Sequence, residues 1–196
     1  MQAESRGPVV VDLVAPPEIA RWRPLLHWLM AFPHLLINQA LGMLRGVLTL
    51  IAFFTVLFTK QIPRPLFDVI VMTLRYQWRV MSYVLFMRES YPPFDFTPTT
   101  EDDGSDPAIL SIEYPTELSR FMPLIKWFLA IPHFVALAFM LVGFVFAWII
   151  AFFAVLFTGR YPEGIRNYGV GLTRWSTRVL AYVGLLSDEY PPFSMS

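Results

Sequence analysis

Residues 127–159 read WFLAIPHFVALAFMLVGFVFAWIIAFFAVLFTG, a run of 33 residues without Asp, Glu, Lys or Arg. His133 is the only ionisable residue in this run. A helix crosses the hydrocarbon core of a bilayer with about 20 apolar residues. The whole chain is 56% hydrophobic and 15% charged, whereas soluble domains average about 25% charged residues. The sequence therefore predicts an integral membrane protein.

This apolar run has a counterpart 99 positions earlier in the chain. IAFFTVLFT at 51–59 aligns with IAFFAVLFT at 150–158, and Tyr-Pro-Pro-Phe occurs at both 91–94 and 190–193. The alignment needs no insertion or deletion from Arg21 to Phe94, which indicates a tandem duplication. We predict five segments: an N-terminal tail with a short strand (1–20), a first membrane repeat (21–96), an acidic polar linker (97–107), a short strand and entry (108–119), and a second membrane repeat (120–196).

Each repeat is predicted to contain the same elements in the same order, in an all-α membrane fold with short β-prone runs at the surface. The elements are a β-prone run (9–14 and 108–114), a short amphipathic helix (21–32 and 120–131), a long apolar helix opened by Pro-His (35–59 and 134–158), and a second long helix (65–87 and 164–186). Between the repeats, TPTTEDDGSDP at 97–107 is rich in acids and turn formers, and we interpret it as a solvated linker.

The second long helix of each repeat could cross the membrane or lie in its interface. Each carries two arginines, which would need partners at membrane depth but could reach headgroups from an interface. Apolar residues surround most of each helix, which favours a crossing and four spans in all. An even number of spans per repeat would bring both β-prone runs to one side, where they could pair. The flanking charges select no orientation.

Four arginines on these helices are the candidates for binding lipid headgroups or another anion. Arg75 and Arg79 share one narrow helix face with Asp68, and Arg174 and Arg178 share the equivalent face. Guanidinium groups match phosphate oxygens, and charges at membrane depth usually have a partner and a purpose. The alternative, which we favour, is structural: the arginines fix the rotation of each helix through acids, backbone carbonyls or headgroups.

His34 and His133 follow a proline at the start of each long apolar helix. Two histidines from two copies could ligate a haem or a pigment. In the alternative, which we favour, a neutral imidazole caps the helix start and binds headgroups, because Pro-His alone has no supporting ligand pattern. We therefore expect no metal site and no obligatory cofactor.

Asn38 and Arg45 interrupt the first long apolar helix. They are seven residues apart and therefore share a face. Phe144 stands in the second repeat where Arg45 stands in the first. An asymmetric polar patch on one of two similar helices predicts a docking face for a partner.

Composition and motifs argue against several classes of function. There is no cysteine, which excludes disulfides and iron–sulfur clusters. The formal net charge is zero, so no basic surface for nucleic acid is expected. No Gly-rich phosphate loop, HExxH or GxSxG occurs, so we expect no catalytic residues. The amino terminus lacks the pattern of a cleavable signal peptide.

The second repeat contains IPHF, IIAFFAVLFTGRYPEG and TRWSTRVLAYVGLLSDEYPPF in this order. This order resembles the bacterial membrane family named domain of unknown function 4389. The resemblance is close over 110–193 and looser over 13–96, where Lys60-Gln61 replaces Gly-Arg. It implies a tandem membrane module and no defined activity.

We therefore expect a non-catalytic, multi-pass protein of the bacterial inner membrane. The first hypothesis is a structural or accessory subunit that packs against a larger membrane complex, with the bilayer and other membrane subunits or a second copy as partners. The second is a lipid- or anion-binding module, or a small transporter, that uses the arginine stripes. The third is a haem or pigment carrier through His34 and His133.

Overall fold

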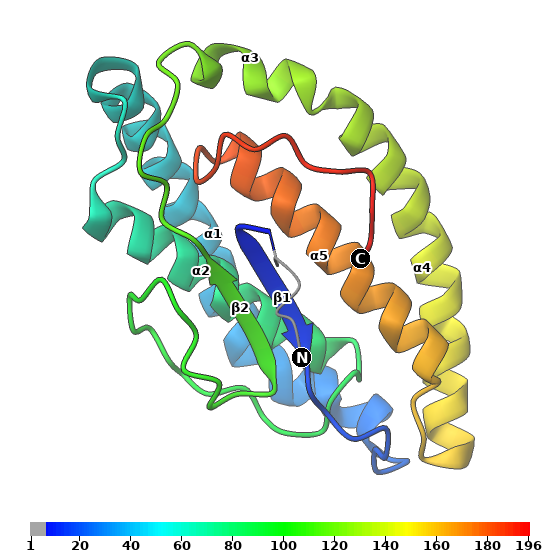
Figure 1. Cartoon of the computed structure of the whole chain (residues 1–196). Helices are drawn as coiled ribbons and strands as arrows, with labels where there is room; N and C mark the ends of the chain where they lie inside the picture. Colours follow the sequence, from blue (N-terminus) through cyan, green and yellow to red (C-terminus); the bar gives the residue numbers. More distant parts are fainter. Residues whose placement is uncertain (1–6) are drawn as a thin grey trace, which may run out of the picture.

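The computed structural model describes residues 7–196, which form two strands and five helices. The elements are β1 (Val9–Leu13), α1 (Arg23–Thr59), α2 (Arg64–Val84), β2 (Ala108–Ile112), α3 (Met122–Leu129), α4 (Ile131–Thr158) and α5 (Glu163–Val183). Figure 1 shows both strands lying over α2 and α5, with α3 and α4 curving around the outside of α5 and α1 passing behind α2. The prediction of a mainly helical chain with two short strands is confirmed.

The two strands form an antiparallel sheet, as the sequence had allowed for the two β-prone runs. Val11 pairs with Leu110 at the middle of the register, and these positions are 99 residues apart. A residue that pairs with its own counterpart lies on the axis that relates the two copies. The repeats are therefore arranged around a pseudo-two-fold axis through the centre of the sheet.

Each strand packs against the second helix of the other repeat, β1 on α5 and β2 on α2. The segments that follow the strands cross over in the same way. Ile19 N–H donates to the Gly159 carbonyl oxygen at 2.9 Å, and Leu118 N–H donates to the Lys60 carbonyl oxygen at 2.9 Å. Because each repeat supplies part of the other's core, neither repeat buries its apolar residues alone.

The first helices differ from the prediction in one repeat. A short helix followed by a separate long one was expected in both copies. In the second repeat the chain does break, at Ala130 between α3 and α4, but α1 runs unbroken through Pro33. The prediction was wrong for the first repeat because a proline removes one helical hydrogen bond and bends the helix without always ending it.

Two helical stretches of the described residues are long and apolar enough to cross a membrane, Arg23–Thr59 and Met122–Thr158. Neither α2 nor α5 is among them, so the preference for four spans is not supported. Arg75 and Arg79 of α2 are 3% and 2% exposed. Their charged face is covered by β2 and the linker, and other faces of α2 pack on α1, so protein rather than lipid surrounds this helix.

The turn that follows α1 offers a test of backbone strain. Lys60 ends α1 at a φ of 62°, and its counterpart Gly159 ends α4 at a φ of 72°. A left-handed backbone costs a residue with a side chain roughly 1–2 kcal/mol, and glycine is the usual residue at this position. We expect Lys60→Gly to raise the free energy of unfolding by about 0.5–1 kcal/mol after the entropy that glycine adds to the unfolded chain.

Chemical denaturation in detergent micelles measures this change, with Gly159→Ala as the matched reverse. Gly159→Ala should lower the free energy of unfolding by about 1 kcal/mol. A Lys60→Gly variant that is less stable than the natural chain would show that the Lys60 side chain outweighs the strain.

Candidate functional site

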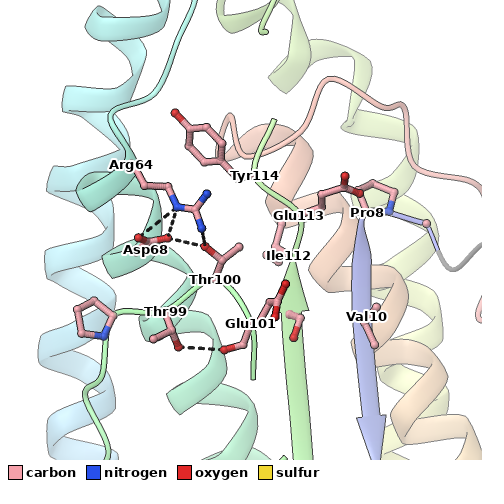
Figure 2. Close-up of a pocket in the computed structure, with 13 residues that line it drawn as sticks. Pro8, Val10, Arg64, Asp68, Thr99, Thr100, Glu101, Ile112, Glu113 and Tyr114 are labelled. Atoms are coloured by element: carbon pink, nitrogen blue, oxygen red, sulfur yellow. Dashed lines mark hydrogen bonds and ion pairs between the residues drawn. The ribbon is translucent and has the colours of Figure 1, made fainter. Parts of the chain in front are cut away.

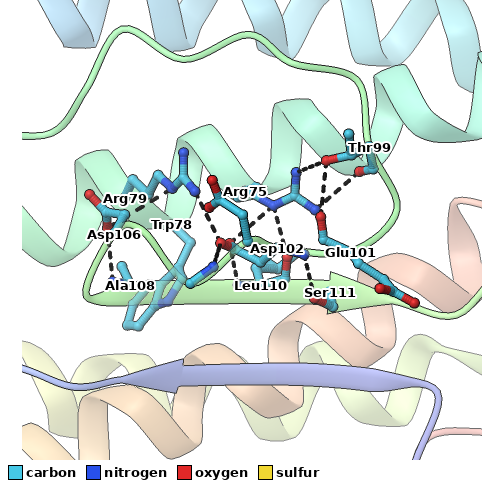
Figure 3. Close-up of polar contacts among 12 residues, drawn as sticks. Arg75, Trp78, Arg79, Thr99, Glu101, Asp102, Asp106, Ala108, Leu110 and Ser111 are labelled. Atoms are coloured by element: carbon cyan, nitrogen blue, oxygen red, sulfur yellow. Dashed lines mark hydrogen bonds and ion pairs between the residues drawn. The ribbon is translucent and has the colours of Figure 1, made fainter.

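The arginines of α2 are held by the segment that follows the first YPPF motif. Arg75 Nε donates to the Leu110 carbonyl oxygen at 2.9 Å and lies 3.1 Å from the Asp102 carboxylate. Arg79 binds Asp102 at 3.2 Å and Asp95 at 2.7 Å. Figure 3 shows Asp102 between the two arginines, over β2. The side chain of Asp102 is fully buried, so these ion pairs lie inside the protein.

A third arginine, which the sequence analysis did not single out, extends this network. Arg88 is 0% exposed, lies 2.5 Å from the Asp106 carboxylate and donates to the Arg79 carbonyl oxygen. Asp106 and Thr100 are also buried. The interpretation of 97–107 as a solvated linker is therefore wrong for these side chains. Asp102 and Asp106 are buried because arginines outside the linker, on α2 and just after it, pair with their carboxylates.

In this arginine network, burial and neighbouring carboxylates shift the pKa of an arginine in opposite directions. Burial lowers the pKa of the Arg75 guanidinium, and the nearby Asp102 carboxylate opposes that fall. Hydrogen bonds from the Thr97 side chain and backbone, together with Arg79, lower the pKa of Asp95 to about 2. Asp95 is therefore ionised at neutral pH, and its charge helps to hold the linker against α2.

The equivalent arginines of α5 pair with no Asp or Glu side chain among residues 7–196. Their acceptors are main-chain oxygens, those of Val11 and Met195 for Arg174 and those of Ser194 and Ser196 for Arg178. The two repeats thus use the same helix positions to hold a strand and the residues after YPPF, but only the first repeat adds acids. These contacts favour the structural alternative for all four arginines.

The histidines of the two Pro-His motifs hold the two YPPF motifs in place. His34 Nδ1 lies 2.6 Å from the Tyr76 hydroxyl, and its ring stacks on Phe94 with 4.2 Å between centroids. The equivalent partners of His133 are Trp175, at 3.1 Å, and Phe193, at 3.9 Å between centroids. The two sequence motifs are therefore the two sides of one contact, formed once in each repeat.

The structure does not bring His34 and His133 together. Each ring contacts aromatic residues of its own repeat, and no stacking or hydrogen bond joins the two histidines within the described chain. Among residues 7–196, no group of three or more His, Asp or Glu side chains could hold a metal ion. Both imidazoles are fully buried. They therefore bond to protein side chains rather than to headgroups, and this arrangement favours a structural role.

Asn38 and Arg45 lie on the half-buried inner side of α1, in the same stripe as the buried His34 and Ala52. In the part of the chain that the structure covers, Arg45 has neither an ion pair nor a hydrogen-bond partner. A partner that docks on the outer face of α1 would not meet these two side chains. Their position therefore gives no support to a docking face at Asn38 and Arg45.

An apolar cavity of about 530 Å³ lies between α2, α4 and α5. Leu137 and Phe144 of α4, which are the counterparts of Asn38 and Arg45, line one wall. Its few polar side chains are Gln77, Thr173, Ser176 and Thr177. A volume of this size is in the range of small-molecule sites, which are mostly apolar with a few polar groups.

We expect Asp102→Asn to destabilise the protein strongly, because it leaves two buried guanidinium groups without their shared carboxylate. Removing one partner of a buried ion pair typically costs about 3–5 kcal/mol in the free energy of unfolding. The neighbouring Asp103→Asn is the matched control, since Asp103 is exposed and such surface changes stay within about 0.5 kcal/mol. Chemical denaturation in micelles compares the two variants, and equal stabilities would contradict a buried, structural Asp102.

Comparison with protein families gives a match in both halves of the chain. The model of the family described as Domain of unknown function (DUF4389) matches residues 21–95 and again residues 123–195. The comparisons with curated proteins and with solved structures gave no match. The two matched segments contain the histidines, the arginines of α2 and α5 and both YPPF motifs, whereas the arginine partners Val11, Asp102 and Leu110 lie outside them. The chain therefore belongs to the DUF4389 family and carries two tandem copies of its domain.

Proposed function

We propose that this protein is a membrane-bound structural or accessory subunit without catalytic activity. The observation that carries this proposal is the apolar outer surface of α1 and of α3–α4. Leu29, Leu36, Met43 and Leu50 are seven residues apart, share one face of α1 and are 59–74% exposed. Soluble monomers rarely expose contiguous apolar patches larger than a few hundred Å².

The second repeat presents the same kind of surface at the equivalent positions. Phe128, Val135, Val142 and Ile149 are 43–61% exposed on α3 and α4. Between residues 24 and 59 the only charged residue is Arg45, which lies on the inner stripe of α1, and residues 127–159 contain none. Lipid, or the apolar helices of a larger membrane complex, would cover both surfaces, and the bacterial inner membrane is the location that we predict.

Support for a non-catalytic role comes from the way the charged and aromatic side chains are used. Arg75, Arg79 and Arg88 bind carboxylates of the linker. His34 and His133 bind the side chains that fix the YPPF segments. These groups thus hold the linker and the YPPF segments against the helices, and a structural subunit needs nothing further from them.

We expect the purified protein to float with phosphatidylcholine vesicles in a density gradient. The double variant Met43→Asp/Leu50→Asp should reduce the floated fraction at least tenfold, because a charge in hydrocarbon costs up to about 2.5–3.5 kcal/mol. Glu101→Asp, on the linker, is the control and should float like the natural chain.

Mild-detergent extracts should contain the protein in fixed stoichiometry with other membrane subunits. A chain that stays monomeric and soluble without detergent would contradict the proposal.

A second candidate function is lipid binding, which the apolar cavity favours over the arginine stripes. Phe134 and Leu141 line the cavity and are 44% and 54% exposed, so its wall is continuous with the outer apolar surface of α4. One acyl chain could pass from that surface into the cavity. The arginines are bound elsewhere and would take no part.

Native mass spectrometry from mild detergent tests this second function. We expect phospholipid to remain bound to the natural protein, and Ser176→Trp, which places an indole ring in the cavity, to reduce the retained lipid severalfold. Glu101→Trp adds the same side chain at an exposed linker position and should retain lipid normally. Equal retention by both variants would place the bound lipid outside this cavity.

A further inference from the structure

We propose that α1 and α3–α4 lie in the plane of the membrane surface and that the sheet and the linker face water. The proposal rests on the membrane association argued above and specifies how the apolar faces meet lipid. It replaces a crossing of the bilayer, which the length of these helices permits, with an embedded position parallel to the surface.

Charged contacts accompany α2 along its whole length. They begin at Arg64 in its first turn, which binds Asp68 at 3.2 Å, and they continue through Arg75 and Arg79 to Arg88 just past its end. The 21 residues of α2 are about 30 Å long at 1.5 Å per residue. This charged line is therefore as long as the hydrocarbon core of a bilayer is thick.

Polar contacts of two histidines hold α1 beside α2, the helix that carries this charged line. His34 of α1 lies 2.6 Å from the Tyr76 hydroxyl of α2, and His27 Nδ1 lies 3.0 Å from the Tyr83 carbonyl oxygen. The two residue numbers add up to 110 in both pairs, so the helices run antiparallel and residues 64–84 of α2 lie beside residues 26–46 of α1. If residues 35–59 of α1 crossed the bilayer, they would therefore carry the contacts among Arg64, Asp68 and Thr100 into the hydrocarbon beside them.

The linker side of this network is not covered by protein within the described chain. Glu101, Asp103 and Glu113 are exposed. A polar hollow of about 790 Å³ opens between β2, the linker and the start of α2. Figure 2 shows Arg64, Asp68 and Thr100 in contact on one side of this hollow, with Glu101 and Glu113 on the other. Carboxylates rarely face hydrocarbon, and this surface is suited to water.

A position in the plane of the membrane satisfies both surfaces at once. Interfacial helices bury one apolar face about 5–10 Å into the boundary between headgroups and acyl chains. The apolar faces of α1 and α4 would enter lipid, while the inward stripes with His34 and His133 stay inside the protein. The opposite, charged side of the molecule would remain in water.

The absence of cysteine in this chain allows a direct test with single spin labels in phosphatidylcholine vesicles. Labels at Leu29→Cys, Leu36→Cys, Met43→Cys and Leu50→Cys sit on one face over 21 residues, which is about 32 Å of helix. We expect the four depths, measured by oxygen and nickel-chelate relaxation, to agree within a few ångströms. The matched set Phe128→Cys, Val135→Cys, Val142→Cys and Ile149→Cys should give the same flat profile. Asp103→Cys should report water.

Two other results of the labelling experiment would contradict this inference in different ways. A profile that is deepest at 36 and 43, with labels at 29 and 50 reached by an impermeant maleimide from opposite sides, would show a crossing. It would overturn this inference and leave the proposed membrane function standing. Water exposure at all eight positions would overturn both proposals.

Discussion

Two arginine side chains, one from each repeat, fix the position of the sheet at the centre of the molecule. Arg75 donates to the carbonyl oxygen of Leu110, and Arg174 donates to that of Val11. These acceptors are paired with each other in the register. A two-stranded sheet is marginally stable on its own, and here each strand is bound to a helix of the other repeat. The same contact that holds the sheet therefore also joins the repeats.

A residue with a strained backbone conformation also contributes to the contact between the repeats, through its side chain. Phe86 and its counterpart Leu185 have φ values of 60° and 65° just after α2 and α5, where glycine is the usual residue. The Phe86 ring is fully buried and stacks on Trp148 of the other repeat, with 5.5 Å between centroids. The burial of an aromatic side chain across the interface offsets the strain of the turn, and glycine would give up that contact.

Features that follow from the repeat and from composition could be predicted from the sequence. Contacts between residues that are distant along the chain could not. The tandem duplication, the order of the helices and the pairing of the β-prone runs follow from the spacing of 99 and from local patterns. The burial of the linker acids could not be predicted in this way, because an acidic run surrounded by turn formers is typical of solvated loops. Arg88 was missed because it has no arginine counterpart in the second repeat, where Ser187 takes its place. The contact of His34 with Phe94 could have been suspected, since both motifs recur together in each repeat.

The two repeats also show why a long apolar helix is not by itself evidence of a crossing. Length and composition describe one helix, whereas the depth of a helix in a bilayer depends on everything fixed to it. In this protein, α1 is fixed to α2, and α2 carries buried ion pairs and an acidic linker along its length. The apolar and charged residues are separated across the thickness of the molecule rather than along its helices. In the position that we propose, this separation would set one face of the protein against the membrane and would determine the depth of the apolar helices.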